Sequence, residues 1–196
     1  MGSYIHHALQ RGTKMRKGIW IAAILGLVAT CGVGLKAHAA ADTDTVKVGM
    51  TAPNFTLPSQ EDKPISLSDF KGKWVVLYFY PKDQTKGCTI EAHNFQRDQP
   101  KYDKLNAVVL GVSLDTVESH REWCAKDTFS FKMLADPGHK VVDLYGVPIK
   151  SMGPMHFASR QTFLISPEGK VVKFWPDVKV DHHSEEVLAA IDEAKK

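Results

Sequence analysis

Cysteine is scarce in this chain: three occur among 196 residues, at Cys31, Cys88 and Cys124. No two of them form a Cys-x-x-Cys pair, which argues against a disulfide isomerase or a thioredoxin-type electron donor. The sequence also lacks a glycine-rich phosphate loop, internal repeats and low-complexity segments. The length is that of one domain with one sizeable hydrophobic core.

Acidic residues are missing from the first 41 positions, whereas five basic residues occur there. Most of these precede an apolar run from Ile19 to Leu35, and the small residues Ala37-His38-Ala39 follow it. A basic region, an apolar region and an Ala-x-Ala site are the layout of a cleaved secretory signal. We therefore expect residues 1–41 to be a signal peptide, with Met15 as an alternative start, and residues 42–196 to form an exported, periplasmic domain. The alternative is an uncleaved anchor that tethers the protein to a membrane.

The basic character of the full chain comes largely from this leader. The chain has 25 basic and 22 acidic residues, so residues 42–196 carry 20 basic and 22 acidic side chains. A nearly balanced charge gives no reason to expect a nucleic-acid partner. Only two cysteines remain in this part, Cys88 and Cys124.

One of these cysteines follows a strand and a short loop. Residues 74–80 are continuously apolar, with β-branched and aromatic side chains, which is typical of a central strand buried on both faces. Pro81 ends that strand, Thr85 follows in the loop, and Cys88 lies where a helix is expected to begin. Unpaired backbone N–H groups and the partial positive charge of a helix N-terminus favour a thiolate over a thiol. The Thr85 hydroxyl can turn toward the sulfur or hold an oxygen of a small substrate.

A lone cysteine near a helix start is most often a small buried hydrophobe, and that reading of Cys88 competes with a reactive one. The flanking residues favour the reactive one, because Pro81, Thr85 and Cys88 form the pattern Pro-x-x-x-Thr-x-x-Cys, which resembles the active-site signature of peroxiredoxins. The longer stretch Tyr-Phe-Tyr-Pro-Lys-Asp-x-Thr-x-Gly-Cys-Thr-x-Glu-Ala is similar to the peroxiredoxin Q branch, also called bacterioferritin comigratory protein. This resemblance extends from Val48 to the C-terminus.

Strands and helices alternate along residues 42–196. We expect strands over 74–80, 107–114, 131–134, 161–166 and 170–175, and helices over 88–105, 116–126, 141–144 and 184–194. Pro100 is expected to kink or end the first helix, and residues 147–159 are expected to form a loop. This order indicates an α/β fold with a central mixed sheet flanked by helices. The resemblance implies that it is a thioredoxin-like fold with peroxiredoxin additions.

Reduction of a peroxide requires a thiolate that attacks one oxygen, groups that hold both oxygens, and a charge that stabilises the leaving oxygen. The resemblance implies that Cys88 is the peroxidatic nucleophile, that Thr85 and nearby backbone N–H groups orient the peroxide, and that Pro81 limits water access. Arg160 begins the pattern Arg-x-Thr-Phe-Leu-Ile, and in peroxiredoxins an arginine before this strand meets the reactive cysteine. An arginine at the start of a strand is otherwise most often a solvated edge residue.

The sequence leaves two interpretations of the resolving thiol. In many members of the branch a resolving cysteine lies five residues after the first, but that position is His93 here, which we interpret as a surface or half-buried residue. Cys124 in the next helix is then the expected resolving cysteine, and the alternative is a one-Cys enzyme reduced by an external thiol. A disulfide needs Cα atoms within about 7 Å, so we expect the first turn of the Cys88 helix to unwind.

The resemblance thus predicts a monomeric thiol peroxidase that reduces hydrogen peroxide and small organic hydroperoxides, without a metal, haem or flavin cofactor, and the leader pattern predicts that it is exported. Its reductant would be a thioredoxin-like dithiol protein. The alternatives are an exported redox sensor and a thiol–disulfide oxidoreductase of the same fold. Met152, Met155 and His156 match no established copper motif and are expected in core packing or a mobile loop, and His182-His183 are expected to precede and cap the last helix.

Overall fold

The computed structural model describes residues 45–196. The predicted leader lies outside the described residues, together with Met15 and Cys31, and its role stays a prediction. Within residues 45–196 the structure contains no helix that is both long and apolar enough to cross a membrane.

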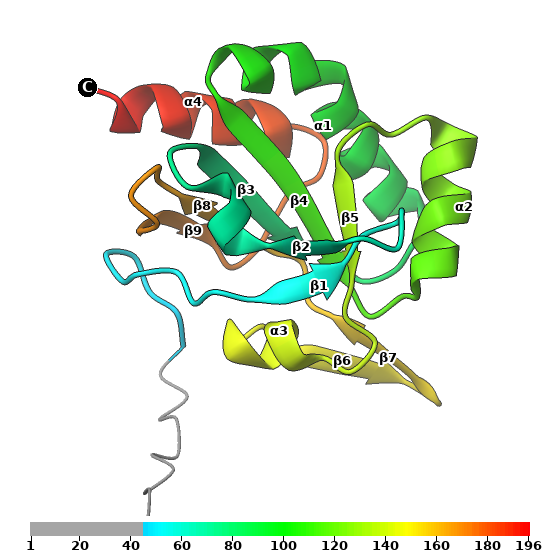
Figure 1. Ribbon diagram of the computed structural model, residues 1–196. Coiled ribbons are helices and arrows are strands. Elements are labelled where there is room, and N and C mark those ends of the chain that lie inside the picture. The colour runs from blue at the N-terminus through cyan, green and yellow to red at the C-terminus, as the bar shows by residue number, and fades with distance from the viewer. Residues whose placement is uncertain (1–44) are drawn as a thin grey trace, which may run out of the picture. The chain divides into compact units, whose positions relative to one another are not determined.

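A five-stranded mixed sheet forms the centre of the fold, in the order β5-β4-β3-β8-β9 (Figure 1). Strand β3 is parallel to β4, and β4 is parallel to β5, whereas β8 is antiparallel to both β3 and β9. The strands are β3 (Trp74–Phe79), β4 (Ala107–Ser113), β5 (Lys132–Ala135), β8 (Gln161–Ile165) and β9 (Val171–Trp175). The predicted strands over 74–80, 107–114, 131–134, 161–166 and 170–175 are therefore confirmed within one or two residues.

The central strand β3 is buried along its whole length, as its apolar run predicted. Successive side chains of a strand point to opposite faces. Val76 and Tyr78 accordingly pack into one apolar cluster, and Leu77 and Phe79 pack into another on the opposite face. The strand therefore separates two cores.

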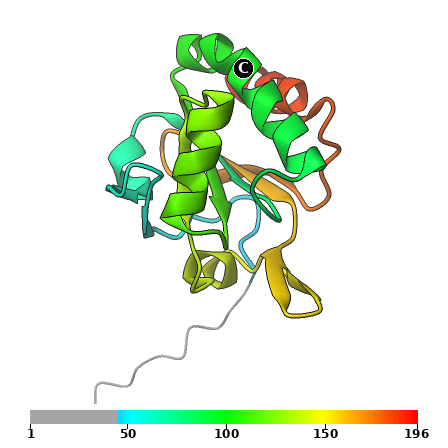
Figure 2. The same ribbon diagram turned by 90° about the vertical axis from the view of Figure 1, so that its right-hand side faces the viewer.

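Helices cover both faces of the sheet (Figure 1). The first core is closed by α1 (Lys86–Lys104), α2 (Val117–Asp127) and α4 (His183–Ala194), with α1 and α2 side by side (Figures 1 and 2). The second core is closed by the short helix α3 (Lys140–Leu144), the 3-10 turn η1 (Leu67–Phe70) and the small sheet of β1 (Thr56–Pro58) and β2 (Pro64–Ser66). The prediction of an α/β fold with a mixed central sheet between helices is confirmed.

Pro100 does not end α1, which continues through it to Lys104. Contacts to α4 hold the helix on both sides of the proline: Ser184 donates to Asp98 at 2.8 Å, and the Tyr102 hydroxyl donates to the Ser184 carbonyl at 3.0 Å. One helical turn earlier, Asn94 donates to the carbonyl of Val180 at 2.9 Å. Tertiary packing therefore outweighs the backbone hydrogen bond that proline removes. It also fixes the second half of α1, while the first two turns lie outside these contacts.

The predicted loop over 147–159 is wrong, because these residues form a β-hairpin of β6 (Ile149–Met152) and β7 (Met155–Ala158). Gly153 lies at its tip with φ +60°, a conformation that glycine adopts without strain. Met152 and Met155 are 61% and 45% exposed, so the expectation of core packing is also wrong. His156 Nδ1 lies 2.8 Å from the Ser151 hydroxyl across the hairpin.

His183 is a buried histidine of the first core, and His182 is the N-cap residue of α4, as expected. The Nε2 atom of His183 lies 2.8 Å from the Thr162 hydroxyl on β8, and its ring meets Phe95 and Trp175 edge-on. Burial lowers the pKa of His183 to about 4, and the positive charge of Arg160 adds to this effect.

Gly111 on β4 gives the first close-packing prediction. A Cβ atom at Gly111 would lie 2.8 Å from the ring and the hydroxyl of Tyr78 on β3, and both residues are in the centre of the sheet. We expect Gly111→Ala to lower the free energy of unfolding by about 1–3 kcal/mol, as overpacking of a core does. Gly138→Ala is the matched control, because the nearest atom to its Cβ would be the flexible end of Lys140 at 4.0 Å. Equal urea midpoints for the two variants would contradict the packing described here.

His183 gives a prediction about acid stability. Its folded pKa lies below the ordinary value of 6.5, so the unfolded chain binds the extra proton first. The contribution of His183 is therefore complete above pH 6.5 and is lost as the pH falls toward 4. We expect wild type to lose about 3 kcal/mol more than His183→Gln over this window, measured by urea unfolding at each pH. Parallel losses in the two proteins would rule out this role.

Candidate active site

The topology of the sheet brings Arg160 to Cys88. Strand β8 begins directly after Arg160, and its first residue, Gln161, pairs with Phe79 at the end of β3. The chain leaves β3 at the same place and reaches Cys88 in the first turn of α1. Arg160 Nη2 donates a hydrogen bond of 3.1 Å to the Cys88 sulfur, although the two residues are 72 positions apart. The prediction that the fold brings the arginine close to this cysteine is confirmed.

Glu91 is a third member of this group, and the sequence reasoning missed it. It lies one helical turn after Cys88, and its carboxylate forms an ion pair with Arg160 Nη1. Only 1% of its side chain is exposed, and burial raises the pKa of Glu91 to about 7 against the opposing attraction of Arg160. The spacing of three residues on one helix face was the signal that could have placed it beside the thiol.

Arg160 stays charged in this buried group. Burial lowers its pKa, but the charges of Glu91 and Cys88 and the hydrogen bonds to them more than offset this, and the pKa of Arg160 is raised. The guanidinium therefore holds a fixed positive charge against the sulfur. A Cβ atom at Gly87 would lie 3.5 Å from Arg160 Nη2, so the arginine also lies against the start of α1.

Thr85 is the N-cap residue of α1, but its side chain does not cap the helix. Its hydroxyl donates to the carbonyl oxygen of Lys82 at 3.0 Å rather than turning to the Cys88 sulfur. Because the hydroxyl proton is used in this bond, the Thr85 oxygen can act toward a substrate only as a hydrogen-bond acceptor. The backbone N–H groups at the start of α1 are left uncapped by Thr85. Pro81 is half-buried at the end of β3, and its predicted role in limiting water stays a prediction.

Cys124 lies in α2 and is 7% exposed. It and Cys88 are both free thiols here, with no disulfide between them. Burial, followed by the negative charge of Asp83, raises the pKa of Cys124 to about 12. Tyr78 belongs to the same apolar cluster as the two cysteines, and its hydroxyl has no hydrogen-bond partner within residues 45–196. Cys124 is therefore a protonated, inert thiol in this conformation.

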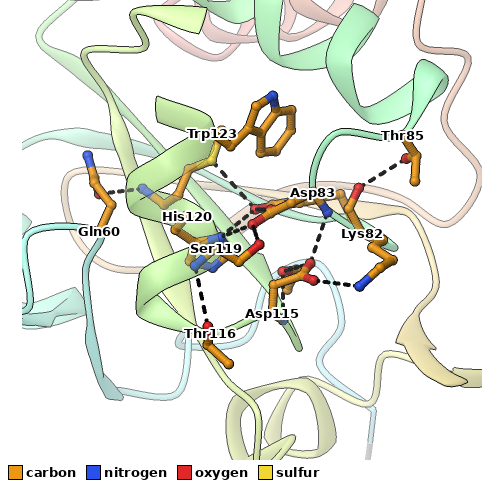
Figure 3. A network of polar contacts seen from close by, with 12 residues as sticks. Gln60, Lys82, Asp83, Thr85, Asp115, Thr116, Ser119, His120 and Trp123 are labelled. Atoms are coloured by element: carbon orange, nitrogen blue, oxygen red, sulfur yellow. Dashed lines mark hydrogen bonds and ion pairs between the residues drawn. The ribbon is translucent and has the colours of Figure 1, made fainter. Parts of the chain in front are cut away.

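A second polar group surrounds Asp83 in the loop before Thr85, as Figure 3 shows. The Asp83 carboxylate accepts hydrogen bonds from the Tyr80 hydroxyl at 2.8 Å and from the Ser119 hydroxyl at 2.7 Å. His120 Nδ1 lies 2.8 Å from the same carboxylate. Gln84 follows with φ +59°, a left-handed conformation that turns the chain between Asp83 and Thr85. The sequence reasoning assigned no role to Asp83 or His120, because nothing local indicates that they meet.

The remaining sequence candidates lie outside these groups. His93 is an exposed residue of α1 that contacts Asp127 at 3.8 Å and the ring of Phe129, which confirms its surface interpretation. Residues 45–196 contain no group of three His, Cys, Asp or Glu side chains that could hold a metal ion. A cavity of about 550 Å³ lies at the opposite end of β3, around Val75 and Ile165, and shares no residue with the Cys88 group.

Known proteins resemble this chain in both fold and sequence. Residues 48–174 match the AhpC/TSA family. The chain is 39% identical over 150 residues to peroxiredoxin Bcp of Bacillus subtilis (strain 168), and this match covers 75% of this chain and 96% of that protein.

Solved structures of peroxiredoxins also resemble this chain. A PrxQ variant from Xylella fastidiosa superposes with a TM-score of 0.72 at 36% identity, over 77% of this chain and 98% of that chain. The bacterioferritin comigratory protein of Xanthomonas campestris, whose structures were determined to study its alkyl peroxide reduction activity, superposes with a TM-score of 0.70 at 36% identity, over 76% and 100% of the two chains. These neighbours identify the fold as thioredoxin-like, in its peroxiredoxin form.

Two further structures, of peroxiredoxin Q from Xanthomonas campestris, carry single cysteine-to-serine changes at two different positions. They superpose with TM-scores of 0.67 and 0.66 at 39% and 38% identity, over 72% and 71% of this chain and 92% and 91% of those chains. The two positions are as far apart in that sequence as Cys88 and Cys124 are here. From the family match, these relatives and the thiol held by Arg160, it follows that the chain belongs to the AhpC/TSA family, in its peroxiredoxin Q or bacterioferritin comigratory protein branch, and is a thiol-dependent peroxidase.

Proposed function

We propose that Cys88 is the peroxidatic nucleophile of this peroxidase. Its thiolate attacks one peroxide oxygen, an S–O bond forms, and the O–O bond breaks. Cys88 becomes a sulfenic acid, and the other oxygen leaves as hydroxide or alkoxide and takes up a proton to give water or an alcohol. The substrates are hydrogen peroxide and small organic hydroperoxides, a choice supported by the alkyl peroxide activity studied in the Xanthomonas campestris neighbour.

The observation that carries this proposal is the bond between Arg160 and the Cys88 sulfur at 3.1 Å. A guanidinium at this position stabilises the thiolate before the attack and the charge on the leaving oxygen during it. Glu91 holds the other side of the fork and so restrains the arginine beside the sulfur. Glu91 thus acts as a positioning residue.

Thr85 and the start of α1 complete the proposed peroxide site. The outward lone pairs of the Thr85 hydroxyl can accept a hydrogen bond from the O–H of a hydroperoxide, since its own proton is held by Lys82. The uncapped N–H groups near Gly87 and Cys88 can donate to the second oxygen. A peroxide held by one acceptor and several donors has its O–O bond in a fixed direction relative to the sulfur.

We propose that Cys124 resolves the sulfenic acid. Its sulfur bonds to the Cys88 sulfur, the S–O bond breaks, and the hydroxyl leaves as water with the Cys124 proton. The matching interval between the two substituted cysteines of Xanthomonas campestris peroxiredoxin Q supports this pairing. Both thiols are buried in separate helices here, so the start of α1 and part of α2 must open first. Contacts of α1 from Asn94 onward, with α4 and with the segment just before it, confine the opening to the first two turns.

The proposal extends to the reductant of the enzyme and to its location in the cell. A thioredoxin-like dithiol protein would reduce the Cys88–Cys124 disulfide of a monomer. The basic and apolar pattern of residues 1–41 supports export to the periplasm with cleavage of a signal peptide, while a retained segment would tether the enzyme to a membrane. The mass of the protein recovered from the periplasm decides this point, because an intact leader would contradict cleavage.

Substitution of Arg160 tests the proposed peroxide chemistry. We expect Arg160→Ala to lower the second-order rate constant with hydrogen peroxide by about 10²–10³-fold, the effect of removing one preorganised donor from a transition state. Arg160→Lys keeps the charge but not the forked guanidinium, so its rate constant should lie between those of wild type and Arg160→Ala. Arg97→Ala is the control, because Arg97 is a half-exposed residue of α1 whose partners Asn94, Asp98 and Glu185 lie outside the Cys88 group. Stopped-flow measurement of sulfenic acid formation gives each rate, and an unchanged Arg160→Ala would refute the site.

Substitution of Cys124 separates the two resolving mechanisms. We expect Cys124→Ser to form the sulfenic acid at the wild-type rate, to accumulate it by mass spectrometry after one equivalent of peroxide, and to lose turnover with a thioredoxin system. Cys88→Ser should not react at all, and serves as the lower limit of both assays. Normal turnover by Cys124→Ser would instead establish a one-Cys enzyme.

A further inference from the structure

One buried carboxylate joins the segments that carry the two cysteines. Asp83 lies in the loop between β3 and α1, five residues before Cys88, and 2% of its side chain is exposed. Its partners Ser119 and His120 lie on α2, and His120 is one helical turn before Cys124. The same contacts therefore join the two thiol-bearing segments, as Figure 3 shows for the loop and α2.

The other polar links between this loop and α2 are weaker. Lys126 reaches the Gln84 side chain at 3.5 Å, and both residues are exposed. Arg121 donates at 3.2 Å to the carbonyl of Gln60, which is outside the loop. Asp83, in contrast, accepts bonds of 2.7 and 2.8 Å from Ser119 and His120 inside the first core. Hydrogen bonds to a buried charge are stronger than those between neutral exposed groups.

The cluster also contains a feature that favours its release. His120 is fully buried, and its Nε2 atom has no hydrogen-bond partner among the residues that the structure describes. A buried nitrogen without a partner regains hydrogen bonds to water when the helix opens. The closed form is thus held by Asp83 and opposed by the second nitrogen of the histidine. Such a balance suits a segment that must open in every catalytic cycle.

We propose that Asp83, Ser119 and His120 form a latch that keeps α2 and Cys124 closed during the attack on peroxide and releases them for the resolving step. These are positioning residues, and the proposal rests on the proposed role of Cys124. In the closed form Arg160 holds Cys88 for the first step, and in the open form the two sulfurs can meet. A weaker latch should shift the protein toward the open form, which speeds disulfide formation and protects the sulfenic acid from a second peroxide.

The opening can be measured without any peroxide chemistry. In a Cys88→Ser background Cys124 is the remaining thiol of residues 42–196, and its alkylation by iodoacetamide reports how often α2 opens. We expect Asp83→Asn and the milder Ser119→Ala to raise the labelling rate, the former by about tenfold or more, since a bond to a charged group is lost. Lys82→Gln is the matched control, because it removes a 3.0 Å ion pair from the same loop to Asp115 rather than to α2. Equal labelling of Asp83→Asn, Ser119→Ala and Lys82→Gln would overturn the latch.

Hydrogen exchange distinguishes local release from general loss of stability. In Asp83→Asn the amides of α2 and of the first turns of α1 should exchange faster, while those of α4 keep the wild-type rate, because the side-chain partners of Asp83 lie at the end of β3 and on α2. Faster exchange in α4 to the same degree would mean that the variant is merely destabilised, and would overturn the proposal. Ser119→Ala, which keeps the Asp83 charge and its bonds to Tyr80 and His120, provides the same comparison with a smaller change.

Weakening the latch should also make Cys88 more resistant to over-oxidation. With both cysteines present, Asp83→Asn should need about tenfold more peroxide than wild type to convert half of Cys88 to sulfinic acid, measured by mass spectrometry. An unchanged or lower threshold, in a wild type that forms the Cys88–Cys124 disulfide, would overturn the latch alone. Absence of that disulfide in wild type would refute the role of Cys124, and the latch with it.

Discussion

The structure depends on one guanidinium that faces two acidic groups in a nearly dry site. Arg160 touches the Cys88 sulfur with one nitrogen and the Glu91 carboxylate with another. A buried cation with no partner is costly, so each of its two neighbours is needed to keep it in place. The antiparallel pairing of β8 with β3 is what delivers it there. The chemistry of the thiol therefore depends on the register of the sheet, since a shift of β8 by one residue would turn every side chain of that strand to the other face.

The proposed mechanism places two conflicting demands on α1, and the fold meets them in different parts of the helix. In the proposed mechanism, attack on peroxide needs the first turn of α1 intact, because Cys88, Gly87 and the capping position Thr85 all belong to it. A disulfide with Cys124 needs that turn to open. The contacts from Asn94 to Tyr102 fix the rest of the helix to α4 and to the segment just before it, so opening of the first turns leaves the core between α1 and α4 in place. Pro100 is tolerated within the fixed half, where tertiary contacts replace the lost backbone bond.

What could be predicted from the sequence was local. The apolar run over 74–80 fixed a strand buried on both faces, and the helix start after Thr85 was placed within two residues. Arg160 was found only because a family pattern surrounds it. Asp83 and His120 were missed because they meet across 37 positions, which no local periodicity encodes. Glu91 was missed although its spacing from Cys88 was visible, because its partner Arg160 lies 69 positions away. The hairpin over 149–158 was missed for a related reason: its side chains are mostly exposed, so no alternation of apolar and polar residues marks its strands.

Burial of Cys124 is consistent with a resolving role. A thiol held protonated, with its pKa raised to about 12 by burial and by Asp83, is a poor nucleophile and a poor target for peroxide. In the proposed mechanism peroxide reacts at Cys88, and burial keeps Cys124 reduced until the resolving step. Opening of α2 removes the burial and separates the sulfur from Asp83, and both changes favour the thiolate. Under the proposed latch, the residues that hold Cys124 inactive in the closed form are the same ones whose separation makes it reactive, so exposure and activation of the thiol would occur in a single step.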